Sequence, residues 1–235
     1  EIMIKLSTSQ CMEKLNNINI LSLTQGYGAY DWNIINHFLE DLTIDKIGRF
    51  ISLNELYTDF GKDITFVTYN YTMGRTEYLS YKNHPHMQCL TAARMSSNLP
   101  IIFSRFKYLN CYYLDGGMTN NFAINKIDNT DVAIAIATKF HVIKQRENFK
   151  IHEYLYDLIC NFVNKEGKLN EKQIYNNCDK IILNTNSYSI NFSMSVNSKL
   201  NMFSDGYQFG KNKILEIIYF KSNLKSNKLC INDSK

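Results

Sequence analysis

The chain has 235 residues, of which 45% are hydrophobic, and a formal net charge of +4, so it can form one sizeable core. Its lysines are scattered along the sequence, which argues against a nucleic-acid-binding surface, and no stretch approaches the roughly eighteen apolar residues of a membrane span. Six cysteines without paired spacing are typical of reduced thiols. We therefore expect a cytoplasmic protein whose contact with membranes is at most peripheral.

The first half of the chain predicts helices followed by a strand pair. Apolar residues have helical spacing over 7–18, and Asp31 can cap a second helix that begins near Trp32. Ser52 and Glu55 form a capping box for a short helix that ends at Gly61. Residues 64–71 and 76–80 are rich in β-branched and aromatic side chains, and Gly74 marks a turn between these two predicted strands.

The second half predicts alternating helices and strands. A helix over 87–98 is ended by Pro100, and strands are expected over 108–114, 131–138 and 180–184. The continuous apolar run at 131–138 is typical of a parallel strand covered on both faces, so we expect it at the centre of a sheet. Helices are predicted over 149–163 and from Ser204, the latter with inward-facing Phe209, Ile214, Leu215, Ile218 and Tyr219. We expect one α/β domain over 1–222 and a polar tail over 223–235 that frays after Lys221.

One stretch has a chemical signature, namely Asp115-Gly116-Gly117 at the end of the strand predicted over 108–114. Glycines can adopt positive φ and let backbone or ligand approach closely, and the carboxyl ends of strands are where ligands bind in α/β sheets. Asp-Gly is also ordinary turn chemistry, so the stretch alone leaves both interpretations open.

Two other groups of reactive side chains have simpler interpretations. His84, His86 and Cys89 have metal-ligand side chains at short spacing, but a closed zinc site needs about four ligands and no second cluster is nearby. Ser96 and Ser97 lack a base beside them and are interpreted as helix-end residues. We expect neither a metal nor another cofactor.

Several short motifs occur in the same order as in the patatin-like phospholipases, and the chain resembles that family. They are Ser52-Leu-Asn-Glu-Leu-Tyr57, Gly61 to Asn70, Gly74-Arg-Thr-Glu-Tyr-Leu-Ser80, Ala92-Ala-Arg-Met-Ser-Ser-Asn-Leu-Pro100 and Asp115-Gly-Gly117, followed by Lys180-Ile-Ile-Leu183, Ile190-Asn-Phe192 and Asp205 to Lys211. The resemblance implies a three-layer α/β/α fold with a mostly parallel central sheet. It also implies a Ser/Asp dyad whose base is Asp115, with Gly116 and Gly117 forming the turn and with structural support from Arg94, Pro100 and Asn121.

The chain departs from the family pattern at several points. Pro100-Ile-Ile-Phe103 stands where the family usually has Pro-Gly-Val-Phe, and Phe122 follows Asn121 where the family usually has Asn-x-Pro. The family begins with a Gly-rich oxyanion loop and a Gly-x-Ser-x-Gly nucleophile elbow, and no Gly-x-Ser-x-Gly occurs in the 235 residues. Since the chain begins with Glu1, we expect a fragment that lacks the N-terminal strands and the nucleophile, is inactive alone and tends to aggregate.

Two functional hypotheses follow from the resemblance. The first is a lipid acyl hydrolase of lipid degradation that acts on phospholipid or acylglycerol esters, with Asp115 as the base. The alternative is a catalytically inactive patatin-like module that binds lipid or protein. A third hypothesis, an unrelated α/β domain with a plain turn at Asp115, is disfavoured by the ordered motifs on both sides of it.

Overall fold

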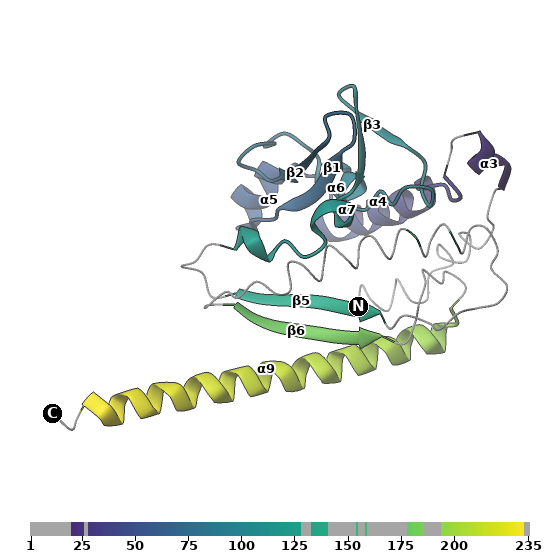
Figure 1. The fold of residues 1–235 in the computed structure, drawn as a ribbon. Coiled ribbons are helices and arrows are strands. Elements are labelled where there is room, and N and C mark those ends of the chain that lie inside the picture. The colour runs from purple at the N-terminus through teal and green to yellow at the C-terminus, as the bar shows by residue number, and fades with distance from the viewer. Residues whose placement is uncertain are drawn as a thin grey trace.

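The computed structural model describes residues 20–25, 28–127, 133–140, 154, 158, 178–185 and 194–232 (Figure 1). Helices and sheets are both present, as the sequence predicts. The helix predicted over 7–18 lies outside the described residues, as does the one over 149–163 apart from Tyr154 and Leu158. The first described helix is α3, Ile20–Thr24.

The largest described sheet is four-stranded and antiparallel. It comprises β1 (Phe66–Asn70), β2 (Arg75–Leu79), β3 (Phe106–Tyr108) and β4 (Cys111–Asp115), in the order β2-β1-β4-β3. β1 pairs antiparallel with both β2 and β4. A mostly parallel central sheet is therefore not what the described residues show, because tight turns join β1 to β2 and β3 to β4 and reverse the chain direction.

The run predicted as one strand over 108–114 is in fact a hairpin. Tyr108 pairs with Cys111, and the two residues between them, Leu109 and Asn110, have φ of 43° and 66°. Positive φ at both central residues is the geometry of a two-residue hairpin turn that matches the twist of the strands. Leu109, although apolar, lies at the tip and is 79% exposed.

The helices packed near this sheet begin and end with the predicted signals. In α4 (Asn33–Ile47), the Asn33 N–H donates to Asp31 Oδ1 at 2.9 Å. The capping box of Ser52 and Glu55 is confirmed at the start of α5 (Leu53–Phe60), and Gly61 ends that helix with φ of 62°. α6 (Cys89–Ser96) ends before Pro100, as predicted.

One hydrophobic cluster joins the helices to the sheet, and a smaller one packs α4 against the segment after α6. The larger contains six buried side chains from α5, β2, β4, α6 and the segment just before α6: Leu53, Leu79, Met87, Ala92, Met95 and Tyr113. The smaller contains Trp32, Ile102 and Phe103, with Ile35 and Leu39 of α4 packed against it. α6 therefore covers the sheet, and α4 lies against α6 (Figure 1).

A second, two-stranded sheet is parallel. It pairs β5 (Ala133–Phe140) with β6 (Cys178–Thr185) along their whole length, so the strand predicted over 180–184 is confirmed. Among the described residues β5 has no partner but β6, so its predicted place at the centre of a sheet stays a prediction. Ala135 packs against Phe122 and Ile124, the latter in the short helix η1 (Ile124–Lys126), whereas Ile134 and Ile136 are exposed.

The last described element is a long helix, α9 (Val196–Asn232), that lies beside β6 (Figure 1). It begins before Ser204 and continues past Lys221, so the predicted start and the predicted fraying are both wrong. The residues predicted to face inward, Phe209, Ile214, Leu215, Ile218 and Tyr219, are exposed. None of the described helices combines the length and the apolar character needed to span a bilayer. The division into a domain over 1–222 and a tail stays a prediction.

Candidate active site

Asp115 is the last residue of β4 and lies opposite Thr68 of β1. Its own N–H donates to the carbonyl oxygen of Asn98 at 2.9 Å, which ties the end of β4 to the segment after α6. Thr68 is fully buried, and its hydroxyl is within hydrogen-bond distance of the carbonyl oxygens of Met95 and Leu114. The backbone around Asp115 is therefore held from two sides by buried hydrogen bonds.

The carboxylate of Asp115 is partly withdrawn from water. Burial raises its pKa from 3.8 to about 6, and the hydrogen bond from the Gly117 N–H to Oδ1, at 2.7 Å, acts in the opposite direction. The other oxygen, Oδ2, has no hydrogen-bond partner among the described residues. A carboxylate with a raised pKa is better matched to accepting a proton near neutral pH than an ordinary surface Asp.

Gly116 and Gly117 lie where a side chain would collide with neighbouring atoms, and their backbone conformation is ordinary. Neither has positive φ, and Gly116 (φ −64°) directly precedes α7 (Gly117–Asn120). A Cβ on Gly116 would lie 2.2 Å from the Val67 carbonyl oxygen, and one on Gly117 would lie 2.9 Å from Asp115 Oδ1. The sequence suggested that these glycines adopt positive φ, and neither does. It also suggested a close approach of backbone, and Gly116 does lie close to the backbone of Val67.

Arg94 reaches the backbone of Asp115 through Asn98. The guanidinium donates to Asn98 Oδ1 at 2.6 Å, and Asn98 Nδ2 donates to the Tyr113 carbonyl oxygen at 2.6 Å. Both side chains are buried, at 5% and 1% exposure. Asn98 had no role assigned from the sequence, although it lies within the motif that ends at Pro100. The sequence carries little signal for this role, because Asn98 follows Ser96 and Ser97 and resembles another polar residue at a helix end.

Pro100 and Asn121 lie near the site without touching the carboxylate of Asp115. Pro100 is half-buried in the turn after α6, next to Ile101, whose φ is 70°. Asn121 follows α7 and is exposed, and its Oδ1 lies 3.0 Å from where a Cβ on Gly117 would be. Their support of Asp115 stays a prediction.

No nucleophile lies beside Asp115 within the described part of the chain. The Ser97 hydroxyl donates to the Ala93 carbonyl oxygen at 2.7 Å, and the Ser96 carbonyl oxygen accepts the Gly116 N–H at 3.3 Å. Ser97 therefore acts as a helix-end residue, and the same interpretation of Ser96 stays a prediction. Among the described residues, no group of three His, Cys, Asp or Glu side chains could hold a metal ion. The geometry is that of a partly buried carboxylate with one oxygen that has no partner among the described residues.

The sequence of this region is patatin-like. The sequence model of the patatin-like phospholipase family matches residues 15–126, a segment that contains α4 to η1 and therefore Asp115 and everything that holds it. The resemblance inferred from the ordered motifs is confirmed. The motifs after residue 180 lie outside this match.

A curated relative also matches over most of the chain. It is the "Probable lipid hydrolase 463L" of Invertebrate iridescent virus 6, which is 27% identical over 175 residues. The match covers 74% of this chain and 56% of the viral protein, so the chain spans little more than half the length of that relative.

Proposed function

We propose that the protein is a lipid acyl hydrolase in which Asp115 is the base of a Ser/Asp dyad. The observation that carries the proposal is the carboxylate itself: it lies in the patatin-like segment, has its pKa raised to about 6, and keeps Oδ2 without a partner among the described residues. The substrates are phospholipid or acylglycerol esters, which places the activity in lipid degradation. The viral relative, named as a lipid hydrolase, supports the substrate class.

In the proposed mechanism, Asp115 accepts and returns the proton in each half of the reaction. A serine from a nucleophile elbow that is not among the 235 residues attacks the ester carbonyl carbon, and its hydroxyl proton passes to Asp115 Oδ2. When the tetrahedral intermediate collapses, Asp115 returns that proton to the oxygen of the leaving alcohol. Water, deprotonated by the same carboxylate, then attacks the acyl-serine, and Asp115 passes that proton to the serine oxygen as the fatty acid leaves. The Gly117 N–H holds Oδ1 throughout and so fixes the orientation of the carboxylate.

The family resemblance supplies the finer parts of the proposal. They are the three-layer α/β/α arrangement, supported here by the parallel pairing of β5 and β6, and a cytoplasmic location with peripheral contact to membranes. No cofactor, metal or nucleic acid is part of the proposal.

The test is fatty acid release by the protein expressed from its complete coding sequence. Phosphatidylcholine and triacylglycerol emulsions are the substrates, and Asp115→Asn is compared with Asp63→Asn, an exposed carboxylate. Because a general base contributes roughly 10²–10⁴-fold, Asp115→Asn should lower kcat by at least about a hundredfold, and Asp63→Asn should leave it unchanged. The acid limb of the kcat/KM profile should lie near pH 6. Full activity of Asp115→Asn would overturn the proposal.

A second candidate function is binding without turnover. It is favoured by one observation, the absence of a Gly-x-Ser-x-Gly elbow from the 235 residues. In that case the protein would bind phosphatidylcholine vesicles, release no fatty acid and resist labelling by a serine-directed fluorophosphonate. Labelling of a serine, together with fatty acid release, would exclude this alternative.

A further inference from the structure

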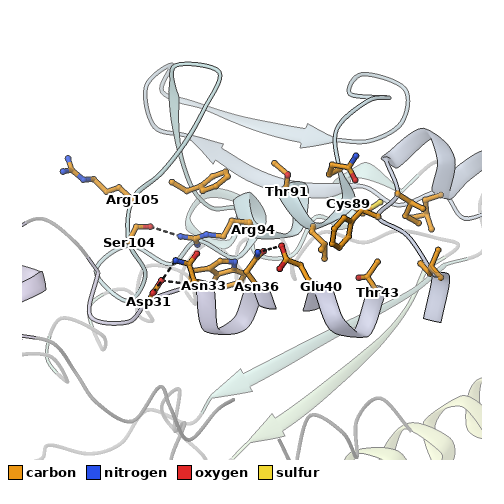
Figure 2. Close-up of a pocket in the computed structure, with 18 residues that line it drawn as sticks. Asp31, Asn33, Asn36, Glu40, Thr43, Cys89, Thr91, Arg94, Ser104 and Arg105 are labelled. Carbon is orange, nitrogen blue, oxygen red and sulfur yellow. Dashed lines mark hydrogen bonds between the residues drawn. The ribbon is translucent and has the colours of Figure 1, made fainter. Parts of the chain in front are cut away.

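A cavity of about 610 Å³ lies between α4 and α6, and Asp115 is not among its lining residues. Figure 2 shows it extending along α4, with Arg94, Ser104 and Asp31 toward one end and Thr43 and Cys89 toward the other. Its volume falls within the roughly 300–1,000 Å³ of small-molecule sites. The mechanism proposed above makes no use of it.

One end of the cavity contains, among the described residues, a buried guanidinium without an ion pair and one buried N–H donor without an acceptor. Arg94 donates to Asn98 Oδ1 and to the Ser104 carbonyl oxygen, and no carboxylate within the described part of the chain forms an ion pair with it. The indole N–H of Trp32 is buried without an acceptor among the described residues. The guanidinium lies 4.5 Å from the Trp32 ring centroid, so these donors lie side by side. A buried donor left unsatisfied is costly, which favours a ligand that brings an acceptor.

The acidic side chains of the cavity are already engaged. Asp31 accepts the backbone N–H of Asn33 at 2.9 Å, and Glu40 Oε1 accepts from Asn36 Nδ2 at 2.7 Å. Burial lowers the pKa of Arg94 to about 10, and Asp31 opposes that change, so the guanidinium remains a cation at neutral pH. Arg94 is therefore a buried cation at this end of the cavity that no carboxylate of the described residues contacts directly.

The other end of the cavity is apolar. It is lined by the last residue of α4 and by residues from the segment after it, α5 and α6, namely Ile47, Phe50, Ile51, Leu56 and Leu90. Phe50 is 47% exposed, so part of this apolar lining is open to solvent. At about 1.5 Å per residue, the 15 residues of α4 span roughly 22 Å, enough for an extended alkyl chain.

We propose that this cavity binds a single-chain carboxylate, with the anionic head accepting hydrogen bonds from Arg94 and the Trp32 N–H and the alkyl tail lying between α4 and α6. The site goes beyond the proposed hydrolysis, because binding here needs no nucleophile and no turnover. Asn98 lies between the cavity and the candidate active site: its side chain accepts from Arg94, and its carbonyl oxygen accepts the Asp115 N–H.

The chain provides its own probe, since Trp32 is its single tryptophan. Dodecanoate below its micelle concentration is titrated into the 235-residue chain while Trp32 emission is recorded, in parallel with dodecanol, dodecyltrimethylammonium and acetate. Hydrogen bonds to charged groups are the strong ones, so dodecanoate should bind at least about tenfold more tightly than dodecanol or the cation. Acetate, which lacks a tail, should bind more weakly still. Equal affinity for all of these, or no saturable change, would overturn the proposal.

A variant that fills the cavity tests its location. Thr91 lines the cavity from α6, and Thr91→Phe should weaken dodecanoate binding about tenfold or more by occupying the path of the tail. Thr58→Phe, at an exposed position on α5, is the matched control and should bind as the wild type does. Unchanged binding by a folded Thr91→Phe would contradict the proposal. Asp115→Asn should bind dodecanoate like the wild type, so failure of the hydrolase proposal leaves this test intact.

Discussion

Burial of Asp115 makes the stability of the protein depend on pH. In the unfolded chain its carboxyl ionises near pH 3.8, whereas in the fold its pKa is about 6. Between these values the folded state binds more protons than the unfolded state, so this group's effect on stability becomes unfavourable as pH rises from about 4 to 6. The difference corresponds to roughly 3 kcal/mol at neutral pH, which is an upper value because the side chain is not fully buried.

Replacing Asp115 by Asn should therefore stabilise the chain above pH 7. The expected gain in the free energy of unfolding is up to about 3 kcal/mol at pH 8 and close to zero at pH 3.5. Urea unfolding followed by Trp32 fluorescence at both pH values measures it. Asp63→Asn, at an exposed carboxylate, should show no such difference between the two pH values, and a destabilised Asp115→Asn at pH 8 would contradict the assigned burial.

Because the backbone of Val67 lies close to Gly116, adding one methyl group at Gly116 should destabilise the protein. Because the new Cβ would collide with the Val67 carbonyl, Gly116→Ala should lower the free energy of unfolding by about 1–3 kcal/mol. Gly206→Ala in α9 is the matched control, since nothing lies within 4 Å of its Cβ, and it should increase helix stability by up to about 1 kcal/mol. Circular dichroism melts report both, and equal effects of the two substitutions would contradict this role of Gly116.

Among single residues, the sequence identified the candidate base but not the residues that hold it. A carboxylate followed by two glycines after an apolar run is a local pattern that singled out Asp115, and the resemblance to the patatin-like phospholipases implied its role as the base. Asn98 was not found, because its importance comes from Arg94, Tyr113 and Asp115, which only the fold brings around it.

In the turn between β3 and β4, Leu109 has a backbone conformation that its side chain disfavours. Leu109 has φ of 43° and is 79% exposed, and Asn and Gly are the residues that favour positive φ in such turns. Leu109→Asn should therefore stabilise the protein by roughly 0.5–1 kcal/mol. Lys107→Asn, on the exposed face of β3, should destabilise it slightly, because Asn disfavours strands. Thermal melts of both variants distinguish a turn effect from a general effect of asparagine.

The ends of helices were easier to predict from the sequence than the pairing of strands and the packing of helices. Ser52, Glu55 and Gly61 mark the limits of α5 by contacts within a few residues, and the structure has all of them. The pairing of β5 depends on β6, about forty residues further along, and its apolar run was equally compatible with a central strand. The apolar spacing of α9 indicated a helix but could not show which element covers it.

The two hydrophobic clusters around α6 and the sheet form a core that does not involve α9. Their buried members lie between Trp32 and Tyr113, and α9 contacts β6 while most of its large apolar side chains are exposed. Such exposed side chains favour self-association. The free energy of unfolding of this core, as reported by Trp32, should therefore not depend on α9.

A chain that ends at Met194 tests this independence. The unfolding free energy reported by Trp32 should stay within about 0.5 kcal/mol of the full chain, and the truncated chain should elute closer to monomer size in gel filtration. Leu53→Ala is the positive control, since Leu53 is 1% exposed and its truncation should cost about 2–5 kcal/mol in the same assay. If removing α9 instead lowers the unfolding free energy reported by Trp32 as much as Leu53→Ala does, α9 belongs to the same cooperative unit as the core. That result would contradict the proposed independence of the core from α9.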